Sequence, residues 1–212
     1  MKIIGINGSP RKNWNTHMLV DEALKGAASK GAETELVHLS DLRFRGCASC
    51  FACKRKETLG HCGFSDELLP VLERINRSDG LVLGSPIYIF EVSSAMRALI
   101  ERLTFQYITY RADSGTFFNR RIPVLSIYAM NMPEDNIEKT GLAAKFGSYE
   151  SLYSRLLGPA KTLCVTETLQ VDDYGKYEMA RFNPEERRKR REEVFPLDLQ
   201  KAFQMGAQMT GA

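Results

Sequence analysis

The chain has 212 residues, a length typical of one domain whose core needs neither metal nor disulfides in order to fold. Its composition, 43% hydrophobic and 26% charged, is that of a globular protein, and a net charge of +3 is too small to indicate nucleic-acid binding. No apolar run reaches the ~18 residues that a membrane-spanning helix needs, and the apolar N-terminal stretch is too short for a signal peptide. We therefore expect a cytoplasmic protein without a membrane span, whose thiols stay reduced.

Apolar runs that end in Gly, Ser or Pro alternate with helical periodicities along most of the chain. They predict strands at residues 2–7, 33–39, 80–86, 122–130 and 161–169, and helices at 16–30, 93–105, 142–157 and from about residue 65. Strands that alternate with helices predict a parallel sheet covered on both faces, so the fold class is α/β.

The C-terminal part of the chain has a different composition. "NPEERRKRREE" predicts a charged helix that begins after Asn183, and helical sequence continues with an interruption at Pro196. The chain is therefore divided into a domain at residues 1–175 and a charged helical extension at 176–212. The basic run Arg187–Arg191 is interpreted as a solvated helix face with glutamate partners, in preference to a nucleic-acid patch.

The first strand runs into the turn "NGSPRKNWNTH", Asn7–His17, which is rich in hydroxyl, amide and basic side chains. The turn lacks the Gly-Lys-Ser/Thr of a P-loop and the third glycine of a dinucleotide fingerprint. Its backbone N–H groups lie at the positive end of a predicted helix, where one phosphate group can bind. The alternative is a helix start capped by Asn15 or Thr16 without a ligand.

The third strand runs into a second turn, "GSPIYIFEVSS", Gly84–Ser94. In open α/β sheets, ligands bind beyond the carboxyl ends of strands where the winding reverses. Tyr88 and Phe90 offer aromatic surface there, and the backbone of residues 87–90 can donate hydrogen bonds to a planar ring. A hydrophobic loop that packs on a neighbouring segment or a dimer partner is the alternative.

Four of the five cysteines lie in one loop at residues 46–63, "GCASCFACKRKETLGHC", and these are Cys47, Cys50, Cys53 and Cys62. Four thiolates satisfy a [4Fe–4S] cluster, which is the leading interpretation. Thiols without metal, a structural zinc ion and a thioredoxin-like pair remain open. The fifth, Cys164, is predicted to be a small buried residue on a strand. The three histidines form no proton relay, so no catalytic residue is assigned.

The two turns together resemble the NAD(P)H-dependent FMN reductase-like branch of the flavodoxin-like flavoproteins, over roughly residues 1–170. The resemblance implies a three-layer α/β/α sandwich with five parallel strands in the order 2-1-3-4-5. It also implies FMN as cofactor, NAD(P)H as electron donor, and a homodimer or homotetramer. Carried over by position, the phosphate-gripping residues are Ser9, Arg11, Asn15 and Thr16, the ring-bordering residues are Pro86, Ile87, Tyr88 and Ile89, and the opposite side is closed by Ala129 and Asn131.

The cysteine run resembles that of the iron–sulfur flavoproteins, a branch of the same family, and lies in the matching place. This resemblance implies that Cys47, Cys50, Cys53 and Cys62 bind a [4Fe–4S] cluster. We therefore expect an FMN-dependent NAD(P)H oxidoreductase or electron-transfer flavoprotein, whose acceptor is a small molecule or a protein. The alternative is a non-enzymatic flavin- or metal-dependent redox sensor that binds a partner.

Overall fold

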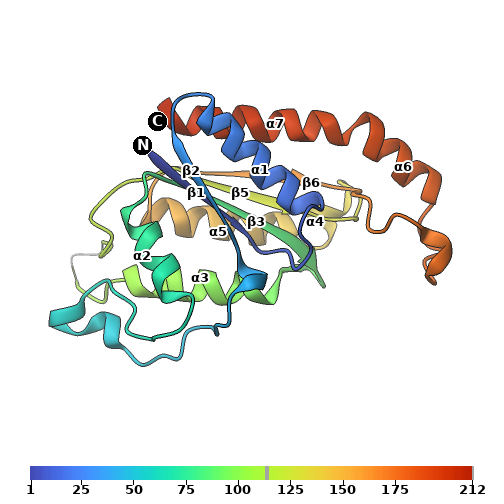
Figure 1. The fold of residues 1–212 in the computed structure, drawn as a ribbon. Helices are drawn as coiled ribbons and strands as arrows, with labels where there is room; N and C mark the ends of the chain where they lie inside the picture. The colour runs from blue at the N-terminus through green and yellow to red at the C-terminus, as the bar shows by residue number, and fades with distance from the viewer. Residues whose placement is uncertain (113–114, 212) are drawn as a thin grey trace.

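A parallel β-sheet lies in the middle of the molecule between two layers of helices (Figure 1). The structure is a computed structural model that describes residues 1–112 and 115–211. The strands are β1 (Lys2–Asn7), β2 (Glu33–His38), β3 (Gly80–Tyr88), β4 (Glu91–Val92), β5 (Val124–Ala129) and β6 (Ala160–Val165). The parallel strands are ordered β2-β1-β3-β5-β6, and β4 pairs antiparallel with the end of β3. Without the short β4, this is the predicted order, which reverses between β1 and β3.

Helices cover both faces of the sheet (Figure 1). The α-helices are α1 (Asn15–Ala28), α2 (Leu69–Arg77), α3 (Ser94–Tyr107), α4 (Asn136–Lys139), α5 (Leu142–Leu156), α6 (Pro184–Glu193) and α7 (Phe195–Gln208). Single 3-10 turns lie at Leu39–Asp41, Ala52–Lys54, Lys56–Thr58, Tyr174–Lys176 and Met209–Gly211. The helices α1 and α7 lie on one face, and α2, α3 and α5 lie on the other.

Alternation along each strand divides the core in two, because successive side chains point to opposite faces of a sheet. Ile3 packs with α1 and α7, whereas Ile4 and Ile6 pack with α2 and α3, and all three are fully buried. Since both faces are covered, the strands are apolar throughout rather than alternating with polar residues.

The C-terminal helix α7 packs closely against α1 through two glycines. A Cβ atom at Gly206 would lie 1.8 Å from the carbonyl oxygen of Ala23, and one at Gly26 would lie 1.9 Å from that of Phe203. Phe195 and Ala202 belong to the same buried cluster as α1. The division at residue 175 stays a prediction, and the packing of α7 shows that both parts share one hydrophobic core.

Two predicted boundaries differ from the structure by more than two residues. Helix α2 begins at Leu69 rather than near residue 65, with Pro70 in its first turn, where proline is tolerated because the N–H it lacks would have no partner within the helix. Strand β6 ends at Val165 rather than at residue 169. Glu167 has a φ of 52°, in the left-handed region, and this turns the chain out of the strand direction.

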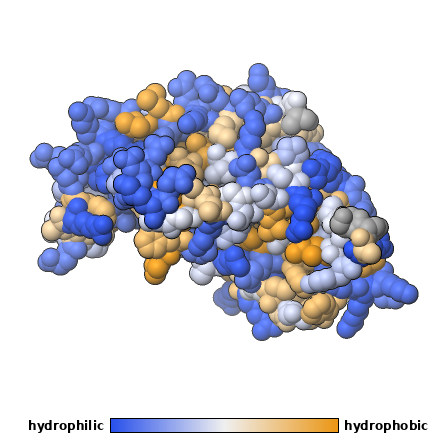
Figure 2. Space-filling model, turned by 180° about the vertical axis from the view of Figure 1, so that it is seen from behind, coloured by the Kyte–Doolittle hydropathy of each residue, from blue (hydrophilic) through white to orange (hydrophobic). Residues whose placement is uncertain are grey.

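The surface seen from the side opposite to Figure 1 is mainly hydrophilic, and its hydrophobic side chains gather in separate patches (Figure 2). Large hydrophobic side chains exposed in the structure include three consecutive residues at the β3–β4 turn, Tyr88, Ile89 and Phe90. Within residues 1–112 and 115–211, no helix combines the length and the apolar character that crossing a membrane requires.

Candidate functional site

A cleft opens at the carboxyl ends of β1, β3 and β5, the point at which the strand order reverses. It encloses about 630 Å³, including its open mouth. Its lining residues are Ser9, Arg11, Trp14, Asn15, Thr16, Pro86, Ile87, Tyr88, Ala129, Met130, Asn131, Thr168, Gln170, Val171 and Met179. Every residue expected to bind the cofactor is among them except Ile89, which is 94% exposed at the β3–β4 turn.

One wall of the cleft is the turn between β1 and α1. Helix α1 begins after Trp14, whose side chain does not cap the helix, and Asn15 and Thr16 lie inside the helix rather than at the capping position considered from the sequence. Ser9 holds the turn in shape: its backbone N–H donates to Asn7 Oδ1 (3.1 Å) and its hydroxyl oxygen accepts from the Arg11 N–H (3.1 Å). The positive end of α1 and the hydroxyls of Ser9 and Thr16 therefore border the cleft.

The second wall is the apolar end of β3. Pro86, Ile87 and Tyr88 line it, and partial burial raises the pKa of the Tyr88 hydroxyl. The following residues, Ile89 and Phe90, have φ values of 48° and 60°. Two left-handed residues in succession are what a tight hairpin turn requires, although a β-branched residue is disfavoured in that conformation. Ile89 is exposed at this turn and does not line the cleft.

The segment after β6 closes the cleft. This part of the site was not predicted, because the last strand was expected to continue to residue 169. Thr168, Gln170 and Val171 line the cleft because the chain leaves the sheet at Val165. Three contacts tie this segment to the first wall. Trp14 Nε1 and Asn15 Nδ2 donate to the carbonyl oxygen of Leu169 (3.2 and 2.8 Å), and Arg11 Nη1 donates to that of Gln170 (2.6 Å). The polar "TET" that follows Val165 is the signal that could have indicated the end of the strand.

The basic run on α6 is only partly the solvated face that the sequence suggested. Arg188 and Lys189 are exposed, but Arg187 is buried, with 7% of its surface accessible. Arg187 Nε donates to Asn131 Oδ1 (2.7 Å), and Arg191 Nη1 donates to Asn15 Oδ1 (2.8 Å). Both guanidinium groups point inward. Each donates to the side-chain amide oxygen of a residue that lines the cleft, and these hydrogen bonds compensate for the water that burial removes.

A second pocket, which encloses about 320 Å³ when the open space at its mouth is included, lies between the cysteine segment and α3. Cys47, Cys50, Cys53 and Cys62 all line it, together with Ala48, Phe51, Gly63, Phe64, Arg102, Phe105 and Gln106. Burial raises the pKa of the Cys53 thiol. In the part of the chain that the structure describes, no three His, Cys, Asp or Glu side chains converge closely enough to hold a single metal ion.

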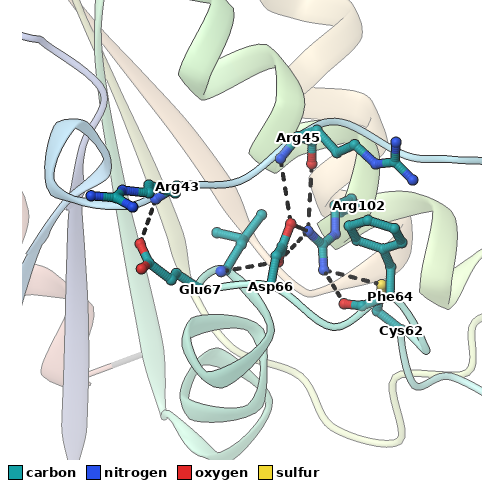
Figure 3. Close-up of polar contacts among 8 residues, drawn as sticks. Arg43, Arg45, Cys62, Phe64, Asp66, Glu67 and Arg102 are labelled. Carbon is teal, nitrogen blue, oxygen red and sulfur yellow. Dashed lines mark hydrogen bonds and ion pairs between the residues drawn. The ribbon is translucent and has the colours of Figure 1, made fainter.

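Arg102 of α3 joins the wall of this pocket to the start of α2 (Figure 3). Its Nη1 donates to Asp66 Oδ1 (2.6 Å), and its Nη2 contacts Cys62 Sγ at 3.5 Å and donates to the carbonyl oxygen of Phe64 (2.8 Å). Only 1% of the Arg102 side chain is exposed, and its Nε is buried without a hydrogen-bond partner among the described residues. Burial raises the pKa of Asp66, but the bonds from Arg102 outweigh this and leave that pKa below its ordinary value.

Cys164, His17 and His38 do not line the cysteine pocket. Cys164 lies on β6 as predicted, half-buried, and burial raises its pKa to about 11. The rings of His17 and His38 stack with centroids 5.1 Å apart, and His38 Nδ1 lies 3.0 Å from Asn7 Nδ2.

A doubly wound α/β sheet with a cleft at its point of strand reversal defines a flavodoxin-like protein. The sequence profile of the NADPH-dependent FMN reductases matches residues 1–132, and the chain belongs to that family. An iron–sulfur flavoprotein of Methanocaldococcus jannaschii is 41% identical over 102 residues, which are 48% of this chain and 51% of the relative. The chain thus spans about half the length of the curated relatives it matches.

Solved structures share the fold. An NAD(P)H:quinone oxidoreductase from Methanothermobacter marburgensis has a TM-score of 0.72 at 16% identity, with 99% of this chain and 97% of that chain covered. An FMN-dependent NADH-azoreductase from Bacillus anthracis, solved in complex with FMN, has a TM-score of 0.67 at 13% identity, with 98% and 99% covered. At these identities the likeness establishes the flavodoxin-like fold alone.

Proposed function

We propose that the protein is an FMN-dependent oxidoreductase that takes electrons from NAD(P)H and passes them to a small-molecule or protein acceptor. The observation that carries this is the cleft at the strand reversal, which has the positive end of α1 on one side and the apolar end of β3 on the other. A bound FMN supplies two-electron reduction with one-electron release, which links a nicotinamide to acceptors of either kind.

The residues that line the cleft fit FMN. A phosphate accepts hydrogen bonds only, and the α1 terminus, the Ser9 and Thr16 hydroxyls and Arg11 are all donors. The apolar surface of Pro86, Ile87 and Tyr88 suits the ring system, and Ala129, which pairs with Pro86 on the neighbouring strand, lines the same cleft with Met130. The chain's part is to orient the ring and to limit the access of water.

Reconstitution with FMN tests this proposal directly. We expect stoichiometric FMN after gel filtration, and oxidation of NADH or NADPH with a quinone or ferricyanide as acceptor. The double variant S9A/T16V should weaken FMN binding and leave riboflavin binding unchanged, because riboflavin has no phosphate. A protein without bound flavin would refute the proposal. FMN binding with negligible turnover would favour the redox sensor instead.

We propose in addition that the cysteine pocket binds a [4Fe–4S] cluster through Cys47, Cys50, Cys53 and Cys62. A zinc ion needs four ligands at ~2.3 Å from one point, whereas each thiolate of a cubane binds its own iron. Four cysteines that share a pocket without converging on one point fit the second geometry better. Arg102 Nη2 lies 3.5 Å from Cys62 Sγ and favours a thiolate there, and the names of the iron–sulfur relatives agree with this proposal.

Metal analysis after anaerobic purification tests the cluster. We expect iron and acid-labile sulfide in equal amounts, about four of each per chain. C62S should lose both and keep FMN, whereas the matched control C164S should keep both. Stoichiometric zinc, or iron that stays far below stoichiometric after reconstitution, would contradict the proposal.

We propose that the protein works as a homodimer or homotetramer in the cytoplasm. The exposed Tyr88, Ile89 and Phe90 lie beside the cleft and offer an apolar contact for a second copy. The location is inferred from the cysteines, all of which are free, as expected in a reducing compartment. Light scattering of wild type and of I89N/F90G tests the assembly, and a monomeric wild type would contradict it.

A further inference from the structure

Two asparagines line the cleft, Asn15 at the start of α1 and Asn131 in the loop after β5. Both the oxygen and the nitrogen of each side-chain amide form a hydrogen bond. Asn15 Oδ1 accepts from Arg191 Nη1 (2.8 Å), and its Nδ2 donates to the carbonyl oxygen of Leu169 (2.8 Å). Asn131 Oδ1 accepts from Arg187 Nε (2.7 Å), and its Nδ2 donates to Gln170 Oε1 (2.7 Å). The two amides therefore make the same pair of contacts, one to an arginine of α6 and one to the segment after β6.

The geometry of α6 makes this pairing possible. Arg187 and Arg191 are four residues apart, so they lie one above the other on the same side of the helix. The intervening Arg188 and Lys189 are exposed on the other side. One helical turn thus carries two guanidinium groups, of which one reaches the loop after β5 and the other reaches the start of α1.

Both arginines are themselves held in place. Arg187 Nη1 donates to Glu167 Oε1 (2.9 Å), so its planar fork contacts two acceptors at once. Arg191 lies over the ring of Phe195, with 4.1 Å from its guanidinium carbon to the ring centroid. Arg190 pairs with Asp198 of α7 at 2.8 Å, and α7 packs on α1. The helix is therefore anchored to the core and does not move freely with the chain end.

We propose that Arg187 and Arg191 are positioning residues. They hold the start of α1 and the loop after β5 at the separation that FMN requires. Arg191 acts through Asn15 on the phosphate end, and Arg187 acts through Asn131 on the ring end. The amides of Asn15 and Asn131 then serve as structural links, and the phosphate binds the backbone N–H groups of α1 and the hydroxyls of Ser9 and Thr16. This inference rests on the proposed FMN function, because it assigns roles within that site.

The two arginines should differ in which ligand they affect, and this separates positioning from general stabilisation. Riboflavin has the ring but no phosphate. Removal of Arg191 loosens the phosphate end, so it should weaken FMN more than riboflavin. Removal of Arg187 loosens the ring end, so it should weaken both ligands alike. An effect through global stability alone would give the same pattern for both variants.

The experiment measures dissociation constants for FMN and riboflavin by flavin fluorescence, together with Tm, for wild type, R187M, R191M and the exposed control R188M. We expect R191M to weaken FMN by roughly tenfold, the size of one lost hydrogen bond to a charged group, with a much smaller effect on riboflavin. R187M should weaken both ligands by a similar factor. R188M should bind both ligands as wild type does.

If R187M does not fold, E167Q replaces it, because Glu167 contacts Arg187 from a position that does not line the cleft. It should weaken both ligands in the same direction by a smaller factor. Wild-type affinity in R187M and R191M would overturn the inference, and so would equal losses of both ligands in both variants. Failure of the wild type to bind FMN reports separately on the proposed function.

Discussion

The cleft and the cysteine pocket differ in what holds their walls in place. The walls of the cleft follow directly from β1, β3 and β5, strands with apolar residues buried on both faces of the sheet. The pocket is built from an irregular segment between β2 and α2 that contains left-handed backbone at Ser49 (φ 52°) and Phe51 (φ 56°). Its links to the core include the buried ion pair of Arg102 with Asp66 and the hydrogen bonds from Lys54 Nζ to the carbonyl oxygens of Gln106 and Ile108.

The shapes of the two sites therefore depend on a bound ligand to different degrees. Hydrogen bonds across the sheet and between helices shape the cleft even without a ligand. The pocket combines thiols, a buried guanidinium and few regular hydrogen bonds, so its shape depends on a small number of side-chain contacts with α3 and on whatever fills it. Variants that remove one kind of support should therefore affect one site and leave the other intact.

The largest effect is expected for Asp66→Ala, which leaves the Arg102 charge buried and unpaired. Loss of one partner of a buried ion pair costs about 3–5 kcal/mol, and Asp66 and Arg102 have only 12% and 1% of their side chains exposed. Urea unfolding should show the loss of stability, and iron analysis should show a depleted pocket. FMN binding should change little.

Arg45→Gln is the matched control for this variant. Arg45 lies in the same segment and over the Phe64 ring, but its side chain is exposed. Its loss should leave stability and iron content near those of wild type. If D66A has the same midpoint of urea unfolding as wild type, the ion pair does not contribute measurably to stability.

Gly206→Ala should damage the cleft and spare the pocket. The added Cβ would meet the Ala23 carbonyl at 1.8 Å, so α7 must move away from α1 and take α6 with it. Overpacking of this kind costs about 1–3 kcal/mol. We expect a lower free energy of unfolding and weaker FMN binding, with unchanged iron content.

Gly147 of α5 provides the opposite control, because a Cβ there meets nothing within 4 Å. Gly147→Ala should stabilise the protein by about 0.5–1 kcal/mol, since alanine restricts the unfolded chain and favours helix. Equal unfolding midpoints for G206A and G147A would show that α1 and α7 can move apart with little loss of stability.

A smaller, stabilising effect is expected at the rim of the cleft. Ile89 and Phe90 both have left-handed backbone, which Asn and Gly adopt at lower cost. At a protein concentration at which both proteins are monomeric, the variant I89N/F90G should raise the free energy of unfolding by about 1 kcal/mol. Thermal unfolding measures this, and a decrease in stability would show that the two apolar side chains contribute more than their backbone strain costs.

The smallest effect concerns pH and the phosphate end of the cleft. Burial lowers the pKa of His38, and the neighbouring His17 and Lys12 side chains lower it further. An unfolded histidine titrates near ~6.5, so the unfolded chain takes up this proton first as pH falls. Wild type should therefore lose stability between about pH 7 and 5, and His38→Gln should lose less. Identical pH profiles of the two proteins would contradict this assignment.

The family resemblance implied the strand order, and the sequence indicated the five parallel strands and the two turns that border the cleft. The strands and turns are local features, because an apolar run that ends in "NGSP" or "GSP" carries its own strand and turn signals. It also determined that four cysteines share one segment, although not what they bind. The residues of the two turns could be named because each turn lies next to the strand that positions it.

Which residues of the C-terminal part of the chain contact the cleft follows only from the tertiary structure. Arg191 meets Asn15 across 176 residues of sequence, and Asn15 meets Leu169 across 154. A charged helix read locally is expected to be solvated, because arginine is costly to bury without partners. Those partners come from distant loops, so only the assembled fold could turn two arginines of the basic run inward and leave Arg188 and Lys189 in water.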